Sequence, residues 1–156
     1  MTGEKAISAR SVYLSALAVT SALGAWAVEA LGGWDNSLQT LIAFMAIDYV
    51  LGILIALIWH KSQKTADGRF ESHASLKGLI RKFSVLIIVF IAVKLDTVLH
   101  DNGYVRTAVI MFFITNEGFS IIENLGIMGV PMPEVIKDAF AAIKKQSEIN
   151  NSNTKN

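Results

Sequence analysis

The sequence contains no cysteine. Disulfides, cysteine-based zinc sites, thiol nucleophiles and lipid attachment through cysteine are therefore excluded. Charged residues are also scarce, at 17% of the 156 residues against about 25% in an average soluble domain. The net charge of +1 gives no electrostatic argument for binding to nucleic acid.

Apolar residues are abundant instead, at 53% of the chain with a mean hydropathy of +0.47. They are gathered in four runs, at residues 12–31, 38–59, 83–99 and 105–122. A membrane-spanning helix needs roughly 17–25 predominantly apolar residues, and each run fits that length. The pattern predicts an all-α integral membrane protein.

The connections between the runs differ in length. Short polar turns at 32–37 and 100–103 join the runs in pairs, and a longer polar stretch at 60–82 lies between the pairs. The predicted architecture is therefore two helical hairpins, forming a membrane domain over residues 1–143.

Basic residues predict the orientation of the hairpins, because short cytoplasmic loops are enriched in Lys and Arg. Twelve of the 14 basic residues lie in the N-terminal arm, the middle stretch and the C-terminal tail, and the two short turns hold none. Four spans with both termini in the cytoplasm place all twelve on one side. The residues of the expected cytoplasmic basic loop are Lys61, Lys64, Arg69, Lys77, Arg81 and Lys82.

Two alternatives would leave three spans. The N-terminal run ends near Ala25-Trp26-Ala27, which is similar to the cleavage site of a signal peptide. The third run contains Lys94 and Asp96, and the fourth contains Asn116 and Glu117, so both insert only marginally. We expect these two runs to insert as a pair, and the alternative is that one of them lies at the membrane surface.

The C-terminal part contains one more periodic segment. Pro133 suits the first turn of a helix, and apolar residues recur at helical spacing after it. Residues 133–146 are predicted to form an amphipathic helix that lies on the inner leaflet or caps the bundle. Residues 147–156 are polar and predicted to be disordered.

Ionisable groups inside a membrane are costly, so each is a candidate for function. Asp48 and Lys94 fall near the middles of the second and third runs, where they could pair or could line separate wet cavities. In the fourth run Glu117, Ser120 and Asn124 share one helical face, which predicts a pore lining or a helix–helix seam. The candidate intramembrane residues are Asp48, Lys94, Asp96, Asn116, Glu117, Ser120, Glu123 and Asn124.

Enzymatic motifs are absent from the sequence. Its three histidines are scattered, and it contains no HExxH, P-loop or GxSxG motif. We expect no catalysis, no cofactor and no metal site.

Three stretches carry a family resemblance: Ile47–Gly52, Ser75–Lys82 followed by Leu95-Asp96, and Asn116–Asn124 leading to Gly129–Pro133. On these residues the chain resembles the toxin-secretion and phage-lysis holins, over roughly residues 38 to 143. The third stretch is the most specific. The residues that fall on polar positions typical of that family are Asp48, Lys77, Asp96, Glu117, Ser120, Glu123 and Asn124. Some holins have a second start codon near the first, but here no Met follows Met1 until Met45.

The resemblance implies a protein of the bacterial cytoplasmic membrane that forms homo-oligomers and opens lesions in the bilayer. The lesions would release a cell-wall hydrolase (an endolysin) or a toxin, without direct contact with that cargo being implied. The alternative function is a small multispan ion or drug transporter or channel, which would stay closed to proteins.

Overall fold

The computed structural model describes the backbone of residues 2–60, 70–136, 138, 139, 141 and 142, and the side chains from Arg10 onward. The chain divides into two compact units, residues 1–34 and residues 35–156. Both units are helical in the described residues, and no strand occurs there. The predicted all-α class is therefore confirmed.

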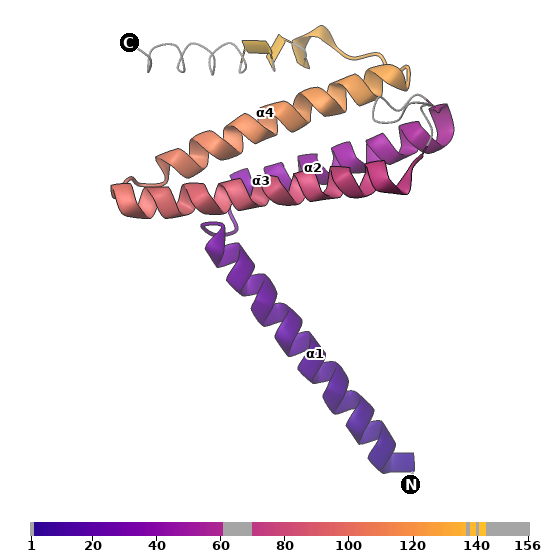
Figure 1. The fold of residues 1–156 in the computed structure, drawn as a ribbon, viewed down its shortest axis with the longest axis vertical. Coiled ribbons are helices and arrows are strands. Elements are labelled where there is room, and N and C mark those ends of the chain that lie inside the picture. Colours follow the sequence, from indigo (N-terminus) through magenta and orange to yellow (C-terminus); the bar gives the residue numbers. More distant parts are fainter. Residues whose placement is uncertain (1, 61–69, 137, 140, 143–156) are drawn as a thin grey trace. The chain divides into compact units, whose positions relative to one another are not determined.

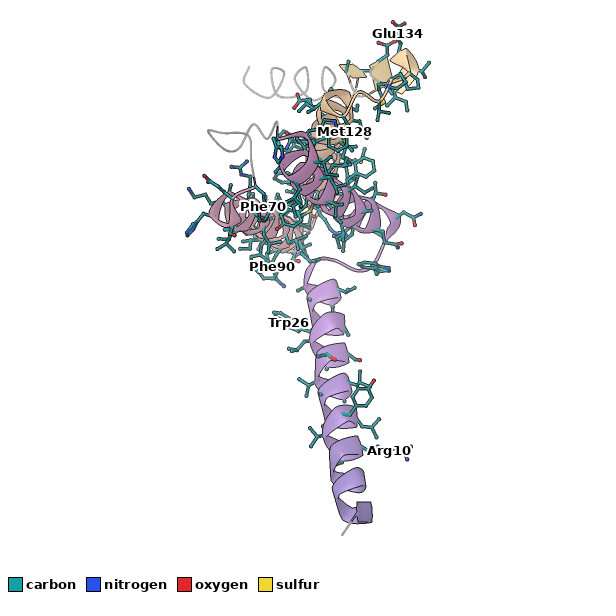
Figure 2. All side chains as sticks on the ribbon, turned by 90° about the vertical axis from the view of Figure 1, so that its right-hand side faces the viewer. Arg10, Trp26, Phe70, Phe90, Met128 and Glu134 are labelled. Atoms are coloured by element: carbon teal, nitrogen blue, oxygen red, sulfur yellow. The ribbon has the colours of Figure 1, made fainter. Side chains whose placement is uncertain are left out.

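The first unit is the single helix α1, Thr2–Ala30. Its segment Arg10–Ala30 is long and apolar enough to cross a membrane, and none of that segment is buried. Arg10 and Trp26 project from the helix in Figure 2, and Trp26 is 68% exposed. A helix that is apolar on all sides is typical of a membrane span.

The second unit contains α2 (Asn36–Leu54), which continues as the short π-helix η1 (Ile55–Trp59), then α3 (Ser72–Leu99) and α4 (Tyr104–Ile127). The three long helices lie side by side (Figure 1). α4 packs most extensively on α2, less on α3, and α2 has the smallest contact with α3. α3 returns alongside α2 in the opposite direction, and a tight turn then makes α4 antiparallel to α3 (Figure 1). α2 and α4 therefore run in the same direction.

The turn between α3 and α4 depends on left-handed backbone conformations at His100 and Gly103, whose φ angles are +53° and +84°. Gly103 occupies the N-cap of α4, where any residue with a Cβ would be strained. This turn lies within the polar stretch that the sequence predicts at 100–103.

The buried residues of the three helices follow a coiled-coil-like spacing of three and four. On α3 they are Val85, Val89, Ala92 and Asp96, and the partly buried Lys82 precedes them on the same stripe. The buried set on α2 begins Leu38, Leu41, Met45, Asp48, and that on α4 includes Arg106, Ile110 and Glu117. This spacing places each set on one stripe that faces the neighbouring helices.

α3 differs most from the prediction. It begins at Ser72 rather than near residue 83, so Lys77, Arg81 and Lys82 are helical and their placement in a loop is wrong. The physical reason is that Leu76, Leu79 and Ile80 continue the apolar spacing between the basic residues, without proline. The other members of the expected basic loop, Lys61, Lys64 and Arg69, lie outside the described residues.

Three segments of the described residues are long and apolar enough to cross a membrane: Arg10–Ala30, Asn36–Trp59 and Tyr104–Ile127. α3 is not among them. The four-span topology and its orientation therefore stay predictions.

The predicted C-terminal helix at 133–146 lies partly outside the described residues. Positions 134–136, 138, 139, 141 and 142 are helical, and Val135 and Ile136 are exposed. The remaining positions of that segment, and the tail predicted at 147–156, are not among the described residues.

Candidate functional site

A cluster of four polar side chains lies at the centre of the α2–α3–α4 bundle. Lys82 of α3 places its Nζ 2.9 Å from Oδ2 of Asp48 on α2, and the same ammonium pairs with Glu117 of α4. Asn124 of α4 donates from Nδ2 to Oδ1 of Asp48, at 2.8 Å. These residues, Asp48, Lys82, Glu117 and Asn124, form the central cluster.

The central cluster is shielded by the bundle. Asp48 and Glu117 are only 6% and 7% exposed, and the side chain of Lys82 is 12% exposed. Among the described residues no buried side-chain nitrogen or oxygen lacks a hydrogen-bond partner. Because a buried charge without a partner costs several kcal/mol, roughly 3–5 when one member of a pair is removed, the cluster depends on all its charged members.

A second polar layer lies at the end of the bundle where α2 and α4 begin and α3 ends. Both carboxylate oxygens of Asp96 accept backbone N–H groups of α4, from Val105 at 2.8 Å and from Arg106 at 2.9 Å. The guanidinium of Arg106 donates to Asp35 at 2.6 Å, and Asp35 in turn accepts the N–H of Leu38 as the N-cap of α2. One arginine and two aspartates therefore tie the first turns of α2 and α4 to the last turn of α3.

Asp35 lies in the turn before α2, and its pKa is affected by this layer. The hydrogen bond from the Arg106 guanidinium holds the pKa of the Asp35 carboxyl below its usual value, against a smaller opposing effect of burial. The ionised carboxylate is therefore the stable form at neutral pH.

About 20 Å separate the two polar layers, because Asp48 is 13 residues after Asp35 and each helical residue rises about 1.5 Å. Buried apolar side chains fill the bundle between the layers. They are Leu38, Leu41, Met45, Val85, Val89, Ala92 and Ile110. The central cluster thus falls near the middle of the combined helix Asn36–Trp59, and Glu117 falls near the middle of α4.

A groove of about 520 Å³ opens between α2 and α3 beside the central cluster. Its lining residues are Met45, Ala46, Leu79, Ile80, Lys82, Phe83 and Leu86. Beyond the groove the two helices meet where the hydroxyls of Tyr49 and Ser75 are hydrogen-bonded at 2.8 Å and where Gly78 lies beside the Tyr49 ring. α2 and α3 are therefore joined at discrete points beside an open groove.

The predicted pairing of Asp48 with Lys94 is wrong. Lys94 is exposed, with its ammonium 5.3 Å from the centroid of the Phe90 ring, and Asp48 pairs with Lys82 instead. Phe90 lies on the outer side of the bundle in Figure 2. Lys94 is two residues before Asp96. Lys82 of the central cluster comes 12 residues earlier in α3, which is about 18 Å away along the helix axis.

The structure divides the other candidate residues between buried and exposed positions. Glu117 and Asn124 join the central cluster, and Ser120, between them on the same face, is half-buried. Asn116 and Glu123 are exposed. The face that contains Glu117 and Asn124 thus forms a helix–helix seam in this structure.

Lys82, Asp35 and Arg106 were not among the candidate intramembrane residues. The spacing of α3 could have revealed Lys82, because it precedes Val85, Val89, Ala92 and Asp96 at alternating intervals of three and four. Lys77 and Arg81 fall off that stripe and are exposed. Asp35 precedes the helix start at Asn36, which is a common position for an N-cap.

No group of three or more His, Asp or Glu side chains within the described residues is arranged to hold a metal ion. The central cluster and the second polar layer consist of ion pairs and hydrogen bonds inside a helix bundle. Such a bundle with an apolar exterior and a charged interior is what a membrane protein with a sheltered polar path requires.

Residues 25–145 match the model of the bacteriophage holin family. The chain belongs to that family. The match includes both polar layers and the groove, and it begins near the end of α1. The apolar helices and the family assignment agree that this is a membrane protein.

Relatives in a phage and in bacteria are similar to this chain, and one of them is named a probable holin. The chain is 31% identical over 111 residues to a probable holin of Bacillus phage phi105, covering 71% of this chain and 76% of that protein. It is 37% identical over 117 residues to an uncharacterized 14.9 kDa protein in the nagH 3′ region of Clostridium perfringens, covering 74% and 82% respectively. An uncharacterized Listeria monocytogenes protein is 35% identical over 116 residues, covering 74% and 77%. No solved structure matches this holin-family chain.

Proposed function

We propose that this chain is a holin that self-associates in the bacterial cytoplasmic membrane and opens lesions through which a cell-wall hydrolase, or a toxin, leaves the cell. The observation that carries the proposal is the central cluster, in which two carboxylates and one ammonium lie inside a bundle whose outer surface is apolar. A polar seam of this kind can be satisfied within one molecule or around water shared by several molecules.

We also propose that all four helices cross the membrane, with both termini in the cytoplasm. Support comes from the outer surface of α3, which carries many large apolar side chains that are exposed in the isolated bundle. They are Leu76, Leu79, Ile80, Phe83, Ile87, Ile88, Phe90, Ile91, Leu95, Val98 and Leu99. Exposed apolar patches of this extent indicate contact with lipid or protein. The charge of Lys82 is neutralised inside the bundle, which lowers the cost of inserting α3.

The C-terminal segment after Pro133 is proposed to rest on the inner leaflet. Its exposed apolar residues Val135 and Ile136 would enter the boundary between headgroups and acyl chains, while the basic residues of the tail meet anionic lipid.

Induced expression in a bacterium tests the function. Expressed alone, the chain should stop growth abruptly, and expressed with a cytoplasmic cell-wall hydrolase it should cause lysis, with the hydrolase reaching the wall. A transporter or channel would pass ions while the hydrolase stayed inside. Hydrolase retained in cells that contain the protein in their membrane would contradict the proposal.

Cysteine labelling tests the four-span topology, and the cysteine-free sequence gives a clean background. We expect a membrane-impermeant maleimide added to intact spheroplasts to label Asn36→Cys and Asn102→Cys, and to label Ser72→Cys only after permeabilisation. All three positions are exposed. Labelling of Asn102→Cys only after permeabilisation would show that α3 stays on the cytoplasmic surface.

A further inference from the structure

The contact between α2 and α3 is the weakest of the three helix pairs. Two of its polar links are the Lys82–Asp48 ion pair and the hydrogen bond between Tyr49 and Ser75. The groove of about 520 Å³ lies between the two helices and is lined by residues of both. By contrast, α3 and α4 are fastened at their turn by the two hydrogen bonds that Asp96 accepts. The bundle therefore has one loosely joined side.

Lys82 has a special position in this arrangement. Among the described residues it is the one cation in the central cluster, and it contacts a carboxylate on each of the other two helices. Its ammonium is turned inward, while the residue also forms part of the groove wall. Without Lys82, Asp48 and Glu117 would face each other as buried carboxylates with no counter-charge.

We propose that Lys82 is the latch that holds the bundle in its closed, resting form. Breaking its ion pairs lets α3 separate from α2 along the groove, which gives water access to Asp48, Glu117 and Asn124. This inference rests on the proposed function as a holin. It assigns the delay before opening to Lys82 and the opening movement to α2 and α3.

A simpler role for Lys82 is that of a basic residue that orients α3 in the membrane. Arg81 provides the matched control, because it precedes Lys82 in the same helix, carries the same charge and is exposed. Loss of either residue removes one positive charge from the N-terminal half of α3. Only loss of Lys82 leaves the buried carboxylates of Asp48 and Glu117 without a counter-charge.

The first experiment compares lysis times in cells that hold equal amounts of each variant in the membrane. Lys82→Met should lyse cells earlier than the unchanged chain, Arg81→Met should keep the original time, and Lys82→Arg should restore most of the delay. We expect the open fraction of Lys82→Met to rise on the order of ten-fold or more, as the loss of a buried partner implies. Equal effects of Lys82→Met and Arg81→Met, or a later lysis for Lys82→Met, would overturn the inference.

The second experiment uses lipid vesicles and cross-links α2 to α3, the two helices that the proposal separates on opening. Ala46→Cys and Leu79→Cys line the same groove from α2 and α3, so a thiol-cleavable bis-maleimide can bridge them. The bridge should abolish release of an entrapped protein, and cleavage of the bridge should restore release. The control bridge joins Leu99→Cys to Tyr104→Cys across the turn that stays fastened, and it should leave release unchanged.

The outcomes separate the two proposals. If the unbridged chain releases no entrapped protein, the holin function itself fails. If the unbridged chain releases protein and the groove bridge has no effect, the latch fails while the function stands. A control bridge that blocks release as strongly as the groove bridge would also contradict the assignment of the movement to α2 and α3.

Discussion

At the scale of single residues, the charged side chains inside the bundle act through their partners. Asp96 is buried, and its carboxylate satisfies two backbone N–H groups that the first turn of α4 would otherwise leave unpaired. A carboxylate at this position also interacts favourably with the positive end of the helix dipole. The acid therefore stabilises the α3–α4 hairpin at its turn.

Asp96→Ala should accordingly lower the free energy of unfolding, by about 1–2 kcal/mol as for the loss of a helix cap. Asp96→Asn should cost less, since an amide oxygen can still accept one of the two hydrogen bonds. Reversible unfolding in detergent micelles measures both variants. Asp101→Ala is the control, because it removes a neighbouring carboxylate from the same turn, and an equal loss for Asp101→Ala would contradict the capping role.

Asp35 gives a prediction about pH. The Arg106 guanidinium lowers the pKa of Asp35 in the folded chain, so on acidification the unfolded chain binds this proton first. The stabilisation is complete above the usual aspartate pKa of about 3.9 and is lost as pH falls through that value and below. Because the Asp35 side chain is 48% exposed, we expect the effect to stay under about 1 kcal/mol.

Asp35→Asn isolates this effect, because Asn is an equally good N-cap for α2 but has no charge for Arg106. Between about pH 5 and pH 3, the unfolding free energy of the original chain should fall more steeply than that of the variant. Unfolding in micelles across this pH range measures the difference. If the unfolding free energies of the two proteins change equally with pH, the Asp35–Arg106 ion pair contributes nothing to stability.

At the scale of helices, the apolar runs predicted the positions of the helices well and the contacts between them poorly. Run length and the turn residues around Gly103 predict α2, the end of α3 and the start of α4, because helix formation depends on local spacing, but they place the start of α3 near residue 83 instead of at Ser72. The partner of Asp48 depends instead on which stripe of α3 faces α2. Lys82 was assigned to a loop because its neighbours are basic, although its spacing to Val85 places it on the buried stripe.

Gly78 tests how closely α2 and α3 must approach. A Cβ at this position would lie 3.8 Å from Cε2 of Tyr49, which is ordinary contact, so Gly78→Ala should fold and gain up to about 1 kcal/mol from helix propensity. Gly78→Leu should push α3 away from α2 and cause early lysis. Gly24→Leu is the control, because nothing lies within 4 Å of that site. Lysis at the original time for Gly78→Leu would show that this approach is not needed in the resting form.

At the scale of the whole molecule, the buried charged residues described in the second unit lie in two layers about 20 Å apart, and in the proposed topology the central cluster lies inside the membrane field. The central cluster has a formal charge of −1, from two carboxylates and one ammonium. Moving a unit charge across the full potential is worth about 2.3 kcal/mol per 100 mV. A fraction of that energy is enough to change a resting population several-fold.

We therefore expect an uncoupler that collapses the membrane potential to bring lysis forward. The size of the response should depend on the charges of the central cluster, so a variant that combines Asp48→Asn, Lys82→Met and Glu117→Gln should respond less. Lysis time after uncoupler addition, with membrane protein held equal, gives the comparison. An unchanged lysis time in the original chain would mean that no charge in the bundle moves through the field on opening, and an equal response in the neutral variant would assign the voltage dependence to charges outside the central cluster.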